Sequence, residues 1–192
     1  MGDKNNLKKI MISLPKVCHD KDLSASQIKM LKSPQVGGVL LFADNFDENL
    51  SQVAKLIQSL KAINPELILA IDHEGGSIWR FSDIFRPPAA KFYGDLYKKD
   101  PILACDSCEK AAFLVAKDLK AIGIDWCFAP VVDVHDIKSQ IIGAKHRAFS
   151  EDNKAIVDLA IAWLKGLNKA GIKGCLKHFP GHGRCKLDSH VD

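Results

Sequence analysis

The stretch LILAIDHEGG, residues 67–76, joins a short apolar run to a loop rich in charged and turn-forming residues. The run from Leu67 to Ile71 is continuous in apolar residues, which is typical of a strand buried on both faces of a parallel sheet. Asp72 follows where such a strand ends. Parallel sheets build their sites at the carboxyl ends of strands, in open sheets and in (β/α)8 barrels alike. The stretch therefore predicts an α/β fold with a site beside Asp72.

Four more apolar runs, on either side of this stretch, repeat the pattern. They are predicted as strands over residues 9–14, 36–43, 124–134 and 172–176. Helical periodicity lies between the strands, over residues 24–31, 50–60, 102–122 and 152–170. Asp133, Lys177 and His178 fall at strand ends, as Asp72 does. No G-x-G-x-x-G sequence follows a strand, which disfavours a dinucleotide-binding sheet.

Local signals support the helices and account for one cysteine pair. Ser24, with Gln27 three residues later, forms the capping-box pattern of a helix start, and Gly171 stands at a helix C-cap position. Cys105 and Cys108 have the spacing of a metal or redox motif. They lie inside a predicted helix with no second cysteine pair after them, so we interpret them as structural.

The composition excludes several classes of protein. The 192 residues carry 27 basic and 23 acidic side chains, and the basic ones are scattered, which argues against a nucleic-acid partner. No apolar run approaches the roughly 20 residues that span a bilayer. The first residues show no secretory signal, so the chain is predicted to be cytoplasmic with no membrane partner, and its six cysteines to be reduced.

The segment KHFPGHG, residues 177–183, followed by Asp188-Ser189-His190, carries the most chemical information. Histidines, glycines and a proline directly after an apolar strand predict a sharply turned loop. Asp188 and His190 are two residues apart, so in extended chain their side chains lie on one side. A carboxylate that orients an imidazole makes a general acid/base that works near neutral pH.

These motifs together resemble glycoside hydrolase family 3, in particular its bacterial β-N-acetylhexosaminidases. Residues 177–183 with 188–190 resemble the family signature, and residues 71–81 resemble its segment D-Q-E-G-G-R-V-Q-R-F. Residues 128–134 and 147–152 also fit, so the resemblance runs from about residue 10 to the end. It implies a (β/α)8 barrel, of which residues 1–192 form the N-terminal five or so βα units of one C-terminally truncated domain.

The same resemblance implies the reaction and its residues. The family hydrolyses terminal β-linked N-acetylglucosamine by a retaining mechanism without a cofactor, here on N-acetylglucosaminides such as muropeptides from peptidoglycan recycling. His190 would be the general acid/base, oriented by Asp188. Charged side chains, which make strong hydrogen bonds to hydroxyls, would hold the sugar. By position in the family motifs these are Asp72, Arg80, Arg147, Lys177 and His178.

The chain also departs from the family pattern. His73, Ser77 and Trp79 replace the family's Gln, Arg and Gln. The spacing between Gly143 and Arg147 is longer than in the family, so Lys145 competes with Arg147 as the sugar ligand. Glu74 is interpreted as a solvated carboxylate, with a role in the site as the alternative.

The family's nucleophilic Asp lies downstream of the Asp-Ser-His motif, so no residue of this chain is assigned as nucleophile. The chain alone is expected to be inactive. A truncated remnant that binds sugar weakly at most is the alternative interpretation.

A metal site is a second alternative, of a different class. His178, His182, Cys185 and His190 are residue types that zinc prefers, and they lie close together in the sequence. Their intervals match no standard zinc motif, so the sequence favours a site without metal.

Overall fold

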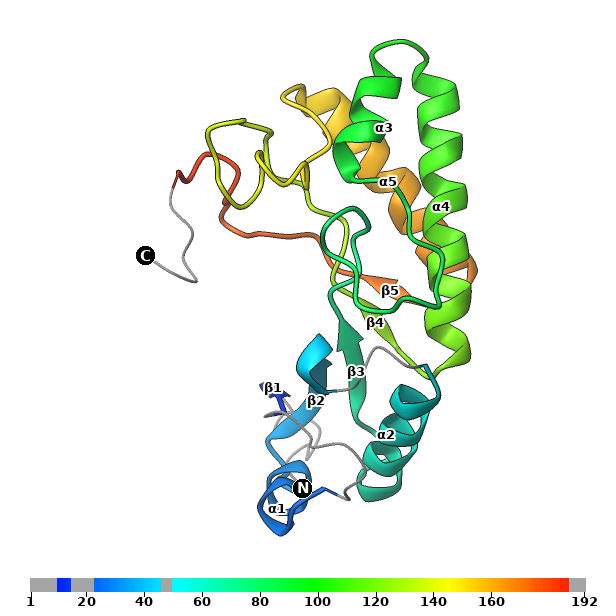
Figure 1. Ribbon diagram of the computed structural model, residues 1–192, viewed down its shortest axis with the longest axis vertical. Helices are drawn as coiled ribbons and strands as arrows, with labels where there is room; N and C mark the ends of the chain where they lie inside the picture. The colour runs from blue at the N-terminus through cyan, green and yellow to red at the C-terminus, as the bar shows by residue number, and fades with distance from the viewer. Residues whose placement is uncertain (1–9, 15–22, 46–49, 187–192) are drawn as a thin grey trace, which may run out of the picture.

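The protein, seen in a computed structural model that describes residues 10–14, 23–45 and 50–186, is built on one sheet of five strands (Figure 1). The strands are β1 (Ile10–Ser13), β2 (Val36–Leu41), β3 (Ile68–Ile71), β4 (Trp126–Cys127) and β5 (Lys173–Gly174). They are ordered along the sheet as in the chain, and every neighbouring pair is parallel. This arrangement confirms the predicted α/β fold as a partial barrel.

Helices connect the strands, among them all four that the sequence predicts. They are α1 (Ala25–Leu31), the 3-10 helix η2 (Ala43–Asn45), α2 (Leu50–Ile63), α3 (Ala90–Tyr97), α4 (Pro101–Ala121) and α5 (Asn153–Lys169). The Ser24 capping box is formed in both directions, and Gly171 has a φ of 78° after α5. Both local predictions are therefore confirmed.

The helix α3 was not predicted, for a physical reason. Its N-cap residue, Ala89, provides no side-chain hydrogen bond, and Gly94 interrupts the apolar pattern. A Cβ atom at Gly94 would lie 1.7 Å from the carbonyl oxygen of Phe149. The glycine is thus required by the close contact between α3 and the segment before α5, which local sequence does not reveal.

The later strands β4 and β5 are much shorter than the predicted runs. Pro130 has no N–H group to continue the ladder after β4. Beyond the regular strands, an isolated parallel bridge joins Val131 to Lys177, and the Val132 amide donates to the Lys177 carbonyl at 2.8 Å. The two segments therefore stay adjacent where they enter the loops that carry Asp133 and His178.

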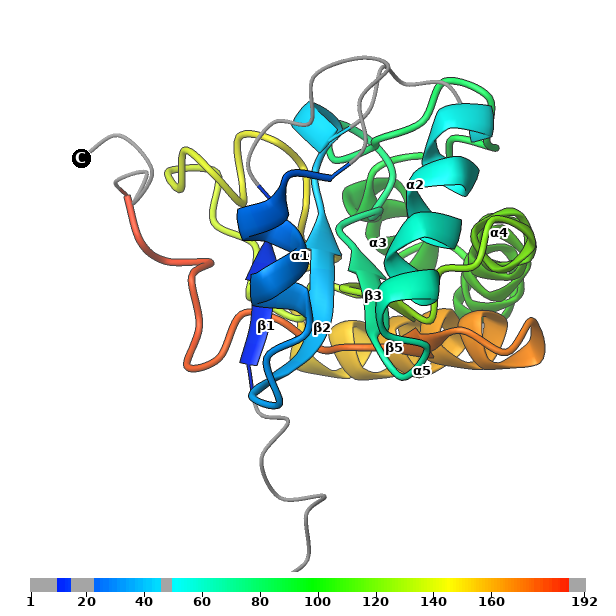
Figure 2. The ribbon, with the colours of Figure 1, turned by 90° about the horizontal axis from the view of Figure 1, so that it is seen from below.

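The helices α3, α4 and α5 pack together into a layer beside the sheet, and α4 and α5 lie side by side in both views (Figures 1 and 2). Tyr93, Cys108, Leu159 and Trp163 are buried in this layer. Cys105 and Cys108 lie within α4, as predicted. Within the described ranges, no helix has the length and apolar character needed to cross a membrane.

Candidate active site

A cluster of charged side chains occupies the carboxyl ends of the strands. The Lys177 ammonium lies 2.5 Å from Asp72 Oδ1 and 2.6 Å from Glu74 Oε1. Asp72 follows β3 directly, and Lys177 follows β5. The parallel sheet therefore brings together two side chains that are 105 positions apart in the sequence. These three residues form one half of what we call the rim cluster.

Arg147 forms the other half through a bidentate ion pair with Glu74. Its Nε lies 2.9 Å from Glu74 Oε2, and its Nη2 lies 2.8 Å from Oε1. Both side chains are almost buried, with 10% of Arg147 and 7% of Glu74 exposed. Lys145, the competing candidate, is exposed to solvent. Of the two candidates, the structure places Arg147 in the cluster.

Glu74 is the residue that sequence reasoning missed. Its expected solvated position is wrong, because the residue is buried and bridges Lys177 and Arg147. Burial favours a raised pKa for Glu74, but hydrogen bonds and charges from Arg147 and Lys177 outweigh it and hold the pKa below its usual value. A second carboxylate two residues after Asp72, in a loop that follows a strand, was the available signal.

His178 completes the rim cluster and joins it to a buried carboxylate. Its Nδ1 lies 2.6 Å from Asp133 Oδ2, and its Nε2 lies 3.4 Å from Arg147 Nη2. Burial favours a raised pKa for Asp133, but hydrogen bonds from His178 and from the backbone of His182 and Gly183 hold the pKa below its usual value. Asp133 is therefore a carboxylate throughout the neutral range.

Arg80 lies near the rim cluster in the sequence, and its described contacts are with Phe42 and His73. Its Cζ lies 6.0 Å from the centre of the Phe42 ring, and its buried Nε has no hydrogen-bond partner in the described part of the chain. The Arg80 amide donates to Nδ1 of His73, a fully buried histidine. Burial, reinforced by the charge of Arg80, lowers the pKa of His73 to about 4. His73 is therefore neutral at neutral pH.

Asp188 and His190, the predicted acid/base pair, lie outside the described residues. The described chain leads to them through the loop that begins at His178. A cavity of about 660 Å³ is lined by this loop together with Asp133, Lys177 and Asn153. Ligands that contact Lys177 and His178 thus have space beside the loop.

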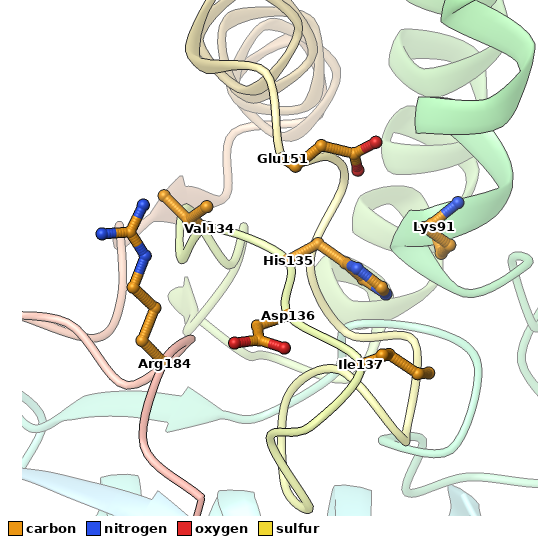
Figure 3. Close-up of a pocket in the computed structure, with 7 residues that line it drawn as sticks. All are labelled: Lys91, Val134, His135, Asp136, Ile137, Glu151 and Arg184. Carbon is orange, nitrogen blue, oxygen red and sulfur yellow. The ribbon is translucent and has the colours of Figure 1, made fainter.

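A second pocket of about 520 Å³ adjoins the first, since both are lined by Val134 and Arg184. Figure 3 shows Arg184, on the segment after β5, facing one side of the loop that contains Asp136 and His135, with Lys91 of α3 on the other side. Among the described residues, no group of three or more His, Cys, Asp or Glu side chains is placed to hold a metal ion. His190, one of the four candidate zinc ligands, lies outside them.

Comparison with known families agrees with this geometry. The model of the glycosyl hydrolase family 3 N-terminal domain matches residues 6–192. The chain belongs to this family.

Similar proteins within the family are named as hexosaminidases. A β-hexosaminidase of Methylobacillus flagellatus is 41% identical over 172 residues, which are 88% of this chain and 48% of the relative. A crystal structure of NagZ from Neisseria gonorrhoeae in complex with N-trifluoroacetyl-D-glucosamine superposes with a TM-score of 0.86 at 37% identity. The match covers 95% of this chain and 53% of that one.

Another structure of the gonococcal protein, in complex with a zinc ion, has a TM-score of 0.85 at 37% identity and covers 94% of this chain and 52% of that one. The chain therefore spans about half the length of the relatives it matches.

Proposed function

We propose that this polypeptide forms the N-terminal part of the catalytic barrel of a β-N-acetylhexosaminidase. The enzyme would hydrolyse terminal β-linked N-acetylglucosamine residues by a retaining mechanism. The observation that carries the proposal is the rim cluster, in which Asp72, Arg147, Lys177 and His178 converge at the strand ends. Support comes from relatives named β-hexosaminidase and from a neighbour that binds an N-acylated glucosamine.

The proposed roles follow from the chemistry of each side chain. Charged donors and acceptors hold sugar hydroxyls strongly, and we assign this role to Asp72, Arg80, Arg147, Lys177 and His178. His190 is proposed as the general acid/base and Asp188 as the carboxylate that orients it. A retaining glycosidase also needs a carboxylate nucleophile, which we place outside these 192 residues. The reaction as proposed uses no cofactor.

The finer parts of the proposal concern substrate and location. Muropeptides and other N-acetylglucosaminides from peptidoglycan recycling are the proposed substrates. The cytoplasm is the proposed compartment, in line with the sequence-based expectation. Membranes and nucleic acids are not proposed as partners.

The test compares two lengths of the polypeptide on a chromogenic β-N-acetylglucosaminide. We expect no turnover by the 192-residue chain and turnover by a version extended through the remaining βα units. In the extended version, His190→Ala is expected to lower kcat by about 10²–10⁴, the usual loss for a general acid/base. Asp188→Asn should lower kcat too, because the imidazolium loses its supporting carboxylate.

Lys186→Ala is the matched control, because Lys186 is exposed on the same segment and has no proposed role. Full activity of the His190→Ala variant would contradict the acid/base assignment. An inactive extended version would favour the alternative, a remnant that binds sugar weakly at most.

A zinc site is a second candidate, favoured by the gonococcal neighbour in complex with zinc. It would use His178, His182, Cys185 and His190. His178 Nδ1 is engaged by Asp133, which leaves only its Nε2 for a metal. Zinc analysis of the purified protein separates the two candidates, because stoichiometric zinc supports the metal site and zinc-free active enzyme contradicts it.

A further inference from the structure

Asp133 connects the rim cluster to the loop that leads towards His190. Its side chain is only 1% exposed, and its two oxygens have different partners. Oδ2 contacts His178 Nδ1 at 2.6 Å, and Oδ1 accepts a hydrogen bond from the His182 amide, also at 2.6 Å. One buried carboxylate therefore contacts a rim-cluster side chain and the loop backbone.

The partners of His178 determine which ring nitrogen carries the proton. A carboxylate only accepts hydrogen bonds, so the nitrogen facing Asp133 must be protonated. An arginine only donates, so the nitrogen facing Arg147 must offer its lone pair. Both contacts are satisfied by a single neutral form, with the proton on Nδ1 and the lone pair on Nε2.

The loop is held tightly against the same carboxylate. At Gly183, a Cβ atom would lie 2.1 Å from the carbonyl oxygen of Val134, so only glycine permits this approach. At Gly181, the φ of 134° is also one that favours glycine. The turn thereby directs the His182 amide at Asp133, and the carboxylate is committed to accepting from two sides.

We propose that Asp133 is a positioning residue that fixes His178 in the Nδ1–H tautomer and so presents Nε2 as a hydrogen-bond acceptor. In the structure the Nε2 lone pair faces Arg147. When a sugar binds, the same lone pair would accept a hydrogen bond from a sugar hydroxyl. The identity of that hydroxyl donor rests on the proposed function, whereas the tautomer rests on the contacts alone. His178 thus selects for a donor on the ligand at this position.

Replacing the carboxylate by an amide tests this arrangement with little change of shape. In Asp133→Asn, the carbonyl oxygen must serve the His182 amide, because a backbone N–H cannot accept a hydrogen bond. The NH2 group then faces His178 and requires a lone pair on Nδ1. The histidine is expected to change to the Nε2–H tautomer. The Nε2–H group of His178 then faces the N–H group of Arg147, so neither can accept from the other.

The measurement is long-range proton–nitrogen NMR on the protein labelled with ¹⁵N-histidine, which distinguishes protonated from unprotonated ring nitrogens. The seven histidines are resolved by ring signals, and a His178→Gln sample identifies the signal of His178. We expect a protonated Nδ1 in the unmodified protein and loss of that form in Asp133→Asn. Asp106→Asn, the same change at an exposed site on α4, should leave the spectrum of His178 unaltered.

The tautomer of His178 in the unmodified protein tests the proposal even if Asp133→Asn does not fold. A protonated Nε2 with a bare Nδ1 in that sample overturns the proposal, as does an unchanged tautomer in a folded Asp133→Asn variant. The measurement needs no substrate and no turnover. Absence of glycosidase activity would therefore count against the proposed function and leave the tautomer assignment intact.

Discussion

The rim cluster and the layer formed by α3, α4 and α5 are both buried, but they bury opposite kinds of chemistry. The rim cluster contains ions, with Glu74 between Arg147 and Lys177. The helix layer contains neutral groups, among them Tyr93 and Cys108, packed against apolar side chains. Buried ion pairs add little stability compared with apolar residues of the same size, because removing charges from water is costly. The comparison indicates that the helix layer contributes more to the stability of the fold than the rim cluster does, in keeping with the binding role proposed for the cluster.

The two regions also respond to pH in opposite directions. The pKa of Glu74 is lowered by its ion pairs despite burial, and the pKa of His73 beneath the rim is lowered by burial to about 4. Acid therefore destabilises this side of the molecule, because the unfolded chain takes up protons that the folded chain resists. In the helix layer, burial raises the pKa of Tyr93 and of Cys108. Alkali destabilises that layer, because the unfolded chain releases protons that the folded chain retains.

The largest expected effect is a loss of stability when a packed side chain is removed from the helix layer. Trp163 of α5 is buried, and its ring meets the ring of Tyr93 edge-on at 6.3 Å. Trp163→Ala should lower the free energy of unfolding by about 3–5 kcal/mol, through lost burial and the cavity that is left. Urea unfolding measures the loss, and Lys165→Ala, on the exposed side of α5, should change it by no more than about 0.5 kcal/mol.

The ring contact of Trp163 is with Tyr93, inside the helix layer, so the loss should be equal at mildly acidic and neutral pH. A loss that depended on pH in this range would show that the two regions are not energetically separate.

The second expected effect is the acid sensitivity contributed by His73. Its pKa is about 4 in the folded protein against 6.5 in the reference state, so its contribution is complete above pH 6.5 and declines as the pH falls towards 4. The loss should total on the order of 3 kcal/mol. His73→Gln removes this titration, so the stabilities of the two proteins should converge, or cross, in acid.

Urea unfolding from about pH 7 to about pH 4.5 measures the difference between the two curves. His146→Asn is the control, since His146 is exposed and its φ of 55° is one that asparagine tolerates. Parallel curves for the unmodified protein and His73→Gln would contradict the buried, neutral state of His73.

The same contrast explains how much could be predicted from sequence. The apolar runs and capping signals predicted a parallel strand–helix alternation, because each depends on neighbours in the chain. The helix α3 was missed because its key contact, Gly94 against Phe149, joins distant segments. The extent of β4 and β5 was overestimated because apolar character does not show that regular pairing stops before Pro130, which has no N–H group to donate.

For the site, sequence placed Asp72, Lys177 and His178 at strand ends, and the structure brings them to one rim. Sequence could not show that Glu74 is buried, because a charged residue in a loop is usually solvated. Its burial depends on Arg147, 73 positions later. The link from Asp133 to His178 was equally invisible, since it crosses from the loop after β4 to the loop after β5.

The smallest expected effect tests the alkaline half of the comparison. Burial raises the pKa of Cys108 above the reference value of 9.0, so its contribution to stability is complete below pH 9.0 and is lost as the pH rises above it. One retained proton corresponds to a loss of about 1.4 kcal/mol per pH unit. Cys108→Ala should make the alkaline decline shallower by that amount. Burial also raises the pKa of Cys105 and Tyr93 in the helix layer, and that of Cys127 to about 12, so these groups contribute to the decline that is left.

Cys185→Ala is the matched control, because Cys185 is exposed and its loss should leave the alkaline slope unchanged. The measurement is the free energy of unfolding under reducing conditions from about pH 8 to about pH 10. An unchanged slope in Cys108→Ala would mean that the Cys108 thiol ionises in the folded protein as it does in the unfolded chain. The helix layer would then not exclude charge, and the opposition between a layer of neutral groups and a rim of ions would fail at its most sensitive point.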